Sequence, residues 1–240
     1  MRLIFEFIYS FLDRFFHKKK IKNYLINLDL DCKIIFDVGS HKGESISFFQ
    51  SIYGKSKIYG FEPQKICFKS LITKFQSNRR IKLINCAIGK IKSDKKLHKN
   101  FLSTTSTFSK INLNSKHFKI KSFILANKSA GFYKNEITKI NTLNYFIKKY
   151  KIKNIDLLKI DTEGHEFEVL LGLENNFKKV KVILIEHNYT DYYLNYNLNK
   201  IKSHLVNNSF KKIKDFKFPF MNYTDAIYVN TKFFREYTLL

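Results

Sequence analysis

The stretch Asp37-Val-Gly-Ser-His-Lys-Gly-Glu44 decides how this chain folds. It follows the apolar run 34–36, which is typical of a short buried strand, and it precedes residues 45–49, which begin a helix. A strand, a turn with two glycines and a helix together form a place to hold a nucleotide-like ligand. Glycine lets the backbone approach the ligand closely, and the helix N-terminus offers free N–H groups. Turns of this shape also occur without a ligand, so the turn alone does not establish a binding site.

A carboxylate lies beyond this turn at the distance that such folds use. Residues 57–61 predict a second strand, which ends at Glu62-Pro63, and Glu62 lies 23 positions after Gly39. In open α/β folds an acidic residue about 20 positions after the glycine turn accepts hydrogen bonds from ribose hydroxyls. The alternative is a solvated charge at a strand end. The spacing and the apolar strand favour the ribose interpretation.

Length and composition indicate one globular domain. The chain has 240 residues, of which 44% are hydrophobic, which is enough for one core and short for two. A polyanionic partner such as RNA or an anionic membrane would explain the net charge of +24. The lysines are spread over nearly every segment, so we favour compositional bias instead. Cys32, Cys67 and Cys86 form no C-x-x-C pair, which argues against a disulfide framework or a zinc site and fits a reducing compartment.

Residues 2–16 predict an amphipathic helix, and the basic run 17–20 comes directly after it. The apolar stretch is shorter than the roughly 20 residues that span a bilayer, and charges interrupt it where a secretory signal would be continuous. Two interpretations stay open. Residues 2–20 would lie on a membrane surface, or the helix would pack on the core or in a dimer contact. Glu6 and Asp13 favour packing, because they do not suit an anionic surface.

The chain divides into a helical N-terminal extension, residues 1–30, and one domain, residues 31–240. Strands and helices alternate through the domain, which is typical of a mostly parallel sheet with helices on both faces. The predicted strands are 34–38, 57–61, 81–85, 155–161, 181–187, 210–217 and 225–230. The predicted helices are 20–30, 43–53, 64–76, 141–150, one after residue 165, and 192–207. The last two strands are joined too tightly for a helical crossover, so they should be antiparallel.

Residues 87–120 interrupt this alternation. They are rich in lysine, serine, threonine and asparagine and show no helical period. We therefore expect an insertion of short strands and loop over the ligand mouth, with a strand near 132–140 after it. The hydroxyl run 103–107 would line a substrate pocket or form an exposed loop, and the exposed loop is the commoner outcome.

Polar side chains gather where the predicted strands end. Ligands in open α/β sheets bind outside the carboxyl ends of the strands. The residues at these ends are Asp37, Glu62, Asn85, Asp161, Glu163, Glu186 and His187. One polar strand end is common, but acids, an amide and a histidine at several ends of one sheet indicate a binding site.

Four segments carry a family resemblance. They are Asp-Val-Gly-Ser-His-Lys-Gly-Glu at 37–44, Gly-Phe-Glu-Pro at 60–63, Asn-Cys-Ala-Ile-Gly at 85–89 and Leu-Leu-Lys-Ile-Asp-Thr-Glu-Gly-His-Glu-Phe-Glu-Val-Leu-Leu-Gly at 157–172. They resemble the FkbM family of S-adenosylmethionine-dependent methyltransferases over roughly residues 33–230. The resemblance implies a class I methyltransferase fold, a doubly wound, Rossmann-like sheet of seven strands. It also implies S-adenosylmethionine as methyl donor and O-methylation of a sugar, a glycan or a small natural product.

The resemblance assigns residues as well. The cofactor-binding residues that it implies are Asp37, Gly39, Ser40, Gly43, Glu62, Pro63, Asn85, Ala87 and Asp161. Glu62 matches the family's ribose acid, and Asp161 and Glu163 match its site after the fourth strand. His165 stands where many members have alanine or another residue, and the first 30 residues lie outside the resemblance.

Methyl transfer to a hydroxyl requires an in-line approach and a base that takes the proton. The candidate bases are Asp161, His187 and His165, and Glu163 is a further catalytic candidate. We favour His187 or Asp161, because both are predicted at strand ends that face the ligand. The alternative for His187 is a structural hydrogen bond to Glu186 or to a loop. Asp161, Glu163 and Glu186 could bind a hard cation, but we predict no metal.

Other functions compete with this prediction. The net charge supports a nucleic-acid methyltransferase, but the chain lacks the Asn/Asp-Pro-Pro-Tyr segment and the Pro-Cys nucleophile of two such classes. A turn of the form Gly-x-x-x-Gly, without Gly-x-Gly-x-x-Gly, disfavours a nicotinamide dehydrogenase. A non-catalytic RNA- or membrane-binding module is the alternative from a different class. We expect a cytoplasmic enzyme, peripheral at most to the inner membrane surface, whose partner is a glycan or small molecule with a free hydroxyl.

Overall fold

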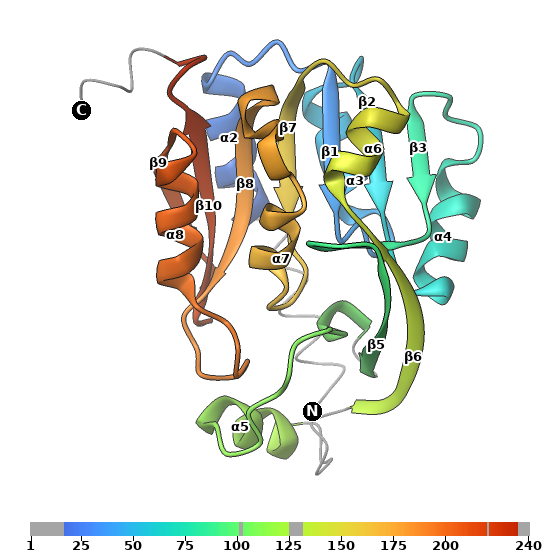
Figure 1. Cartoon of the computed structure of the whole chain (residues 1–240), viewed down its shortest axis with the longest axis vertical. Coiled ribbons are helices and arrows are strands. Elements are labelled where there is room, and N and C mark those ends of the chain that lie inside the picture. The colour runs from blue at the N-terminus through green and yellow to red at the C-terminus, as the bar shows by residue number, and fades with distance from the viewer. Residues whose placement is uncertain (1–16, 101–102, 125–131, 220, 235–240) are drawn as a thin grey trace.

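The computed structural model describes residues 17–100, 103–124, 132–219 and 221–234 (Figure 1). The amphipathic helix predicted over residues 2–16 lies outside them. In these four segments no helix is both long and apolar enough to cross a bilayer.

A seven-stranded sheet forms the centre of the molecule (Figure 1). In spatial order its strands are β3 (Ile81–Ile84), β2 (Lys57–Phe61), β1 (Ile34–Val38), β7 (Ile155–Ile160), β8 (Val180–Asn188), β10 (Tyr223–Asn230) and β9 (Phe210–Lys217). The strands from β3 to β8 are parallel, and β10 is antiparallel to both of its neighbours. The predicted fold class and the antiparallel pair at the C-terminal end are therefore confirmed.

Helices cover both faces of this sheet, which explains why its strands are apolar on both sides. One face carries α2 (Lys18–Asn27), α3 (Glu44–Ile52) and α4 (Lys65–Phe75), and the other carries α6 (Leu143–Lys149), α7 (Glu166–Leu171) and α8 (Leu198–Asn207). Successive side chains of a strand point to opposite faces of the sheet. Leu157 of β7 therefore packs in the apolar cluster of α2, α3 and α4, and its neighbour Leu158 packs in the cluster of α6, α7 and α8.

The part of the predicted N-terminal extension that the structure describes belongs to the core. Ile21 and Leu25 of α2 are buried in the same apolar cluster as Ile46 and Phe49 of α3. Burial of side chains of this size stabilises by about 1.5–3 kcal/mol each. Helix α2 is therefore packed on the sheet and is no free appendage.

The insertion folds into a second, smaller sheet. Its strands, in the order β4-β6-β5, are β4 (Ala87–Ile88), β6 (Phe132–Asn141) and β5 (Ser93–Asn100). Between β5 and β6 the chain forms the short 3-10 helix η2 (Ser103–Thr105) and helix α5 (Lys116–Ile124). Figure 1 shows β5, β6 and α5 beyond the carboxyl ends of the parallel strands, which is where the insertion was predicted to lie.

Helix α5 corrects the prediction that this segment contains only short strands and loop. Ser115 starts the helix, because its hydroxyl oxygen accepts a hydrogen bond from the Phe118 backbone N–H at 2.9 Å. Phe118 is the buried residue of the helix and packs with Tyr192 and Tyr193. A helix held by one buried aromatic side chain shows no apolar period, so the sequence pattern could not reveal it.

The helix predicted over residues 192–207 begins only at Leu198. Asn197 caps it, because its side-chain oxygen accepts a hydrogen bond from the Lys200 N–H at 3.0 Å. The 3-10 helix η3 (Glu174–Lys179) connects α7 to β8. Residues 189–197 are consequently a loop, and this loop carries Tyr192 and Tyr193 to the insertion.

Candidate active site

A cavity of about 390 Å³ lies at the carboxyl ends of the parallel strands. It spans the point where the strand order reverses, between β1 and β7, which is where open α/β sheets bind ligands. Its volume suits a small-molecule ligand. The predicted residues that line it are Gly39, Ser40, Glu62, Pro63, Ala87, Asp161 and Glu163. Asp37, Gly43, Asn85 and His187 do not line it.

The loop after β1 requires both of its glycines. Gly39 and Gly43 each have a φ of +86°, a conformation that residues with a Cβ rarely adopt. A Cβ at Gly39 would lie 1.9 Å from the Asp161 carbonyl oxygen, and a Cβ at Gly43 would lie 2.3 Å from the Phe75 ring. Gly39 therefore brings the loops after β1 and β7 into contact, and Gly43 turns the chain into α3.

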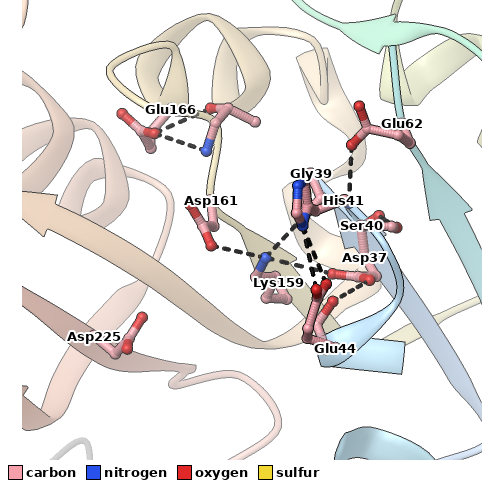
Figure 2. Close-up of polar contacts among 12 residues, drawn as sticks. Asp37, Gly39, Ser40, His41, Glu44, Glu62, Lys159, Asp161, Glu166 and Asp225 are labelled. Atoms are coloured by element: carbon pink, nitrogen blue, oxygen red, sulfur yellow. Dashed lines mark hydrogen bonds and ion pairs between the residues drawn. The ribbon is translucent and has the colours of Figure 1, made fainter. Parts of the chain in front are cut away.

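One buried cation joins these two loops. The Lys159 ammonium lies 3.0 Å from an Asp161 carboxylate oxygen, 3.6 Å from Asp37 Oδ1 and 3.2 Å from the Gly39 carbonyl oxygen (Figure 2). Burial opposes the charge of Lys159, but Asp161 and Asp37 outweigh burial and raise its pKa. Asp37 is fully buried, and the Ser45 hydroxyl donates to its Oδ2 at 2.6 Å. Asp37 thus supports the loop from beneath the cavity.

Glu62 is held by backbone groups at the end of β2. Its side chain is buried, and its two carboxylate oxygens accept hydrogen bonds from the N–H groups of His41 at 2.9 Å and Gln64 at 2.8 Å. Burial raises the pKa of Glu62 to about 7. Each carboxylate oxygen has two lone pairs, so Glu62 can still accept hydrogen bonds from a ligand in the cavity.

The insertion is bound directly to these loops and roofs the cavity. The His41 ring and the Ser103 hydroxyl share a hydrogen bond of 2.7 Å, and the Gln64 side-chain amide donates to the Ser103 carbonyl at 2.9 Å. The Ser106 hydroxyl donates to the Gln64 side-chain oxygen at 3.0 Å. Ser103 and Ser106 belong to the hydroxyl run of the sequence and line the cavity.

Carboxylates dominate the other end of the cavity, after β7 and β8. Asp161, Glu163, Glu186 and Asp225 all line it. Burial and the neighbouring Asp161 raise the pKa of Glu163 to about 7. Burial, Asp161, Glu163 and Asp225 together raise the pKa of Glu186 well above its usual value. These acids crowd one another, so at neutral pH some of them hold or readily accept a proton.

Glu163 is the most precisely held of these acids. Its φ is +55°, an uncommon backbone conformation for a residue with a side chain. Its Oε2 accepts a hydrogen bond from the Tyr193 hydroxyl at 2.6 Å, and its carbonyl oxygen accepts one from the Thr107 hydroxyl at 2.5 Å. Residues of the β8–α8 loop and of the insertion therefore fix its orientation.

Glu166 fixes the loop that carries Asp161 and Glu163. Its Oε1 accepts hydrogen bonds from the Thr162 N–H at 2.9 Å and the Gly164 N–H at 3.1 Å. Glu166 is itself buried, and burial raises its pKa. It acts on the cavity by positioning this loop.

Two histidines also line this end of the cavity. His17 precedes α2, and its Nε2 lies 2.6 Å from Asp225 Oδ2. His165 is buried, its Nε2 has no hydrogen-bond partner among the described residues, and its ring lies 5.4 Å from that of Phe108. Burial lowers the pKa of His165 to about 3, so its ring is neutral at neutral pH.

His187 does not lie where the sequence prediction placed it. Its side chain is fully buried on the opposite face of β8, where its Nε2 is 3.4 Å from the Tyr228 hydroxyl. Successive residues of a strand point to opposite faces, so Glu186 and not His187 faces the cavity. The alternative interpretation of His187 named Glu186 or a loop as its hydrogen-bond partner, but the partner in the structure is Tyr228 of β10.

Asn85 also lies outside the cavity. It is exposed, and its side-chain amide donates to the carbonyl oxygens of Glu62 at 2.8 Å and Pro63 at 3.2 Å. Strand β3 ends one residue earlier than predicted, and the next three residues, Cys86, Ala87 and Ile88, line the cavity instead. Asn85 therefore ties the end of β3 to the end of β2.

The family model described as "Methyltransferase FkbM domain" matches residues 37–218, which contain all of these loops. The chain belongs to the FkbM methyltransferase family. Its predicted membership is thus confirmed. S-adenosylmethionine is the cofactor of this family, which confirms the predicted cofactor. Gly39, Ser40 and Glu62 fit it, because they place a close backbone turn and a buried carboxylate on one end of the cavity.

A solved structure agrees with this family at the level of the fold. An FkbM methyltransferase from Methylobacillus flagellatus KT superposes with a TM-score of 0.53 at 14% identity, over 83% of this chain and 44% of that one. The chain therefore spans less than half the length of that relative. Aeropyrum pernix fibrillarin, solved with S-adenosylmethionine, matches with a TM-score of 0.47 at 13% identity, over 82% and 66% of the two chains. M. capricolum TrmK, solved with S-adenosylhomocysteine, gives 0.48 at 14% identity, over 87% and 66%. The last two scores are too low to support an argument, and no curated protein matches the sequence.

Lys159, His17 and Tyr193 are among the site side chains that sequence reasoning missed, and of these three Lys159 alone left a signal. Lys159 is a lysine in a strand whose other residues are mostly apolar, and a buried lysine requires an anionic partner. His17 and Tyr193 lie far along the chain from the acids that they contact, at Asp225 and Glu163. No local pattern predicts such pairs.

Proposed function

We propose that this protein transfers the methyl group of S-adenosylmethionine to a hydroxyl of a sugar, a glycan or a small natural product. The observation that supports this most strongly is the position and state of Glu163. This carboxylate lines the same cavity as the glycine turn, is oriented by Tyr193, and has a pKa of about 7. A base with a pKa near the working pH is the most effective at removing a proton from a poor nucleophile.

The cofactor would bind at the end of the cavity below β1 and β2. Glu62 would accept hydrogen bonds from its ribose hydroxyls, and Gly39 and Ser40 would lie against it through their backbone. Asp161 extends from the neighbouring loop, where Lys159 holds it at 3.0 Å. When bound, the cofactor supplies an electrophilic methyl group on a sulfonium.

Glu163 would act as the base of the reaction. The Glu163 carboxylate would take the proton of the acceptor hydroxyl as the acceptor oxygen attacks the methyl group. The bound S-adenosylmethionine would supply that methyl group, and the electron pair of the broken carbon–sulfur bond would stay on the sulfur. Tyr193 keeps the carboxylate in place during this step, and burial keeps it basic enough to accept the proton.

The charge of the cavity favours an acceptor without phosphates. Although the chain carries a net charge of +24, six carboxylates line the cavity, those of Glu44, Glu62, Asp161, Glu163, Glu186 and Asp225. A polynucleotide would bring phosphates toward these acids, and like charges repel. A neutral polyol would instead donate hydrogen bonds to them. The free, buried cysteines suit a reducing compartment, so we place the enzyme in the cytoplasm.

Calorimetric titration of the purified protein with S-adenosylmethionine and S-adenosylhomocysteine, with NAD as control, tests the first half of the proposal. We expect binding of the first two and none of NAD. Transfer of a labelled methyl group to a panel of hydroxylated glycans, natural products and RNA tests the second half. Labelling of RNA alone, or no cofactor binding by a folded sample, would contradict the proposal.

A further inference from the structure

Helix α5 has a face that methyl transfer does not use. Lys116, Lys119, Ile120 and Phe123 are all exposed, and we call these four residues the α5 face. Ile120 is 56% exposed and Phe123 is 78% exposed. Residues three apart lie on the same side of a helix, so these two large apolar side chains are neighbours. Single exposed apolar residues are common, but adjacent ones on a helix indicate an interaction surface.

The opposite side of α5 fixes the direction of this face. Phe118 is buried and lies 6.5 Å from the Tyr192 ring, measured between ring centroids. The Lys121 ammonium donates to the Thr105 hydroxyl at 2.9 Å. These contacts hold α5 against the insertion and the β8–α8 loop, so the α5 face points away from the protein.

The charge around the α5 face has one sign. Residues 95–135 contain nine lysines and no aspartate or glutamate. Two acids approach α5 from other elements: Asp191, whose Oδ1 lies 3.4 Å from His117 Nδ1, and Glu163, whose charge acts on Lys121 on the side of α5 that faces the protein. Lys116 and Lys119 therefore flank two exposed apolar side chains in a segment that carries no negative charge of its own.

We propose that the α5 face docks on the surface of an anionic phospholipid bilayer. Ile120 and Phe123 enter the boundary between headgroups and acyl chains, while Lys116 and Lys119 remain at the level of the lipid phosphates. A lysine-flanked apolar helix face binds this boundary through buried apolar area and through attraction to anionic lipids. RNA would use the lysines but would gain little from an exposed isoleucine.

The position of α5 gives this contact a consequence for the active site. Figure 1 shows α5 beyond the carboxyl ends of the parallel strands, at the end of the molecule where those strands deliver the cavity-lining residues. Leu113 and Leu194, which are 64% and 58% exposed, lie on segments joined to each other near this end by the hydrogen bond from the Leu194 N–H to the Lys110 carbonyl. A docked molecule would turn its cavity end toward the bilayer.

Co-sedimentation of the full chain with phospholipid vesicles tests the proposal. One set of vesicles contains phosphatidylcholine alone, and the other contains phosphatidylcholine with phosphatidylglycerol. We expect binding to the second set, weaker binding to the first, and loss of binding in high salt. The measurement needs neither cofactor nor acceptor, so its outcome is separate from that of the proposed methyl transfer.

A matched pair of variants locates the contact. Ile120→Ser/Phe123→Ser removes the apolar part of the α5 face, and we expect it to weaken vesicle binding by at least about tenfold. Ile26→Ser/Val206→Ser removes two side chains of similar exposure, 52% and 63%, that lie at the ends of α2 and α8 away from the cavity. We expect this control to bind vesicles like the wild type.

Three results would each overturn the proposal, and the third comes from a variant of the two lysines. The first is failure of the wild type to bind phosphatidylglycerol vesicles. The second is equal binding by the wild type and Ile120→Ser/Phe123→Ser. All four side chains are exposed, so the variants should fold, and thermal unfolding checks this. A third variant, Lys116→Gln/Lys119→Gln, should weaken binding mainly at low salt. If it instead abolished binding to single-stranded RNA while vesicle binding stayed unchanged, the face would bind nucleic acid.

Discussion

The two ends of the cavity hold their carboxylates in different ways. At the end below β1 and β2, Glu62 is bonded by two backbone N–H groups from its own loop and the neighbouring one. At the end below β7 and β8, Glu163 is held by the side chain of Tyr193, which lies in a loop 30 residues away. The side chain of Glu186 has no hydrogen bond or ion pair with the residues that the structure describes. The first end is a rigid binding site, whereas the second keeps protonatable groups available.

The largest effect should come from the base itself. Glu163→Gln keeps the shape of the side chain but removes its basicity, so we expect kcat to fall by about 10²–10⁴-fold, with cofactor affinity nearly unchanged. Steady-state kinetics and cofactor titration check both parts. Glu168→Gln, on α7 and outside the cavity, is the matched control and should retain activity. Equal activity of the two variants would remove Glu163 from the reaction.

The next largest effect should be the loss of stability caused by a substitution at Gly39, in the turn between the two ends of the cavity. In Gly39→Ala the new Cβ would lie 1.9 Å from the Asp161 carbonyl oxygen at a φ of +86°, so we expect a loss of at least about 2 kcal/mol in the free energy of unfolding. Denaturant unfolding measures it. Gly54→Ala is the control, because its Cβ would lie at an ordinary 3.5 Å from the nearest atom, the Gln50 carbonyl oxygen. Similar stabilities of the two variants would contradict the close approach of the loops.

Glu62→Gln should weaken cofactor binding and leave proton removal by Glu163 unchanged. One of the two backbone N–H groups would face an amide in place of a carboxylate oxygen, so we expect cofactor affinity to weaken by about 1–3 kcal/mol. Calorimetric titration measures this, and the pH dependence of kcat should stay as in the wild type. An unchanged affinity in a folded protein would exclude Glu62 from the cofactor site.

Tyr193→Phe should shift the pH dependence of kcat. The pKa of Glu163 is about 7, so kcat should rise as the pH increases through that value and the carboxylate loses its proton. The hydrogen bond from Tyr193 favours the charged carboxylate and lowers that pKa. Its removal should shift the rising limb to higher pH by about one unit. A merely structural role for Tyr193 would lower kcat without moving the limb.

The smallest effect should come from His187→Gln. Its side chain lies on the far face of β8, so kcat should stay within about threefold of the wild type. Glu186→Gln, one position earlier, changes a residue of the cavity and should change kcat more. The comparison of the two variants tests which face of β8 takes part in the reaction. A larger loss in His187→Gln, in a folded protein, would reverse our assignment.

The sequence predicted the fold and the cofactor end better than the acceptor end, for physical reasons. The glycine turn and Glu62 depend on contacts between neighbouring loops, and strand periods and spacing reveal them. Residues 182–185 of β8 are apolar on both faces, so no alternation shows whether Glu186 or His187 faces the ligand. The pairs of Glu163 with Tyr193 and of Asp225 with His17 depend on how distant segments pack.

The insertion shows the same limit. Strand β5 is exposed over its first four residues, and α5 buries a single phenylalanine in its middle. A sequence with so few buried apolar residues looks the same whether it forms a strand, a helix or a polar loop, so neither β5 nor α5 could be predicted. The position of the insertion over the cavity was predictable, because it follows the carboxyl end of β3, at the edge of the sheet where ligands bind. Its internal structure was not.

The hydrogen bond from the Lys159 ammonium to the Gly39 carbonyl oxygen joins residues that are 120 positions apart in the sequence. During synthesis on the ribosome the glycine turn emerges first, and β1 must wait for β7, because the centre of the sheet forms only when these two strands pair. Contacts between such distant residues slow folding, and the unpaired edge of β1 is open to wrong partners during the delay. We therefore expect nascent chains that end before residue 155 to lack a cofactor site and to depend on chaperones.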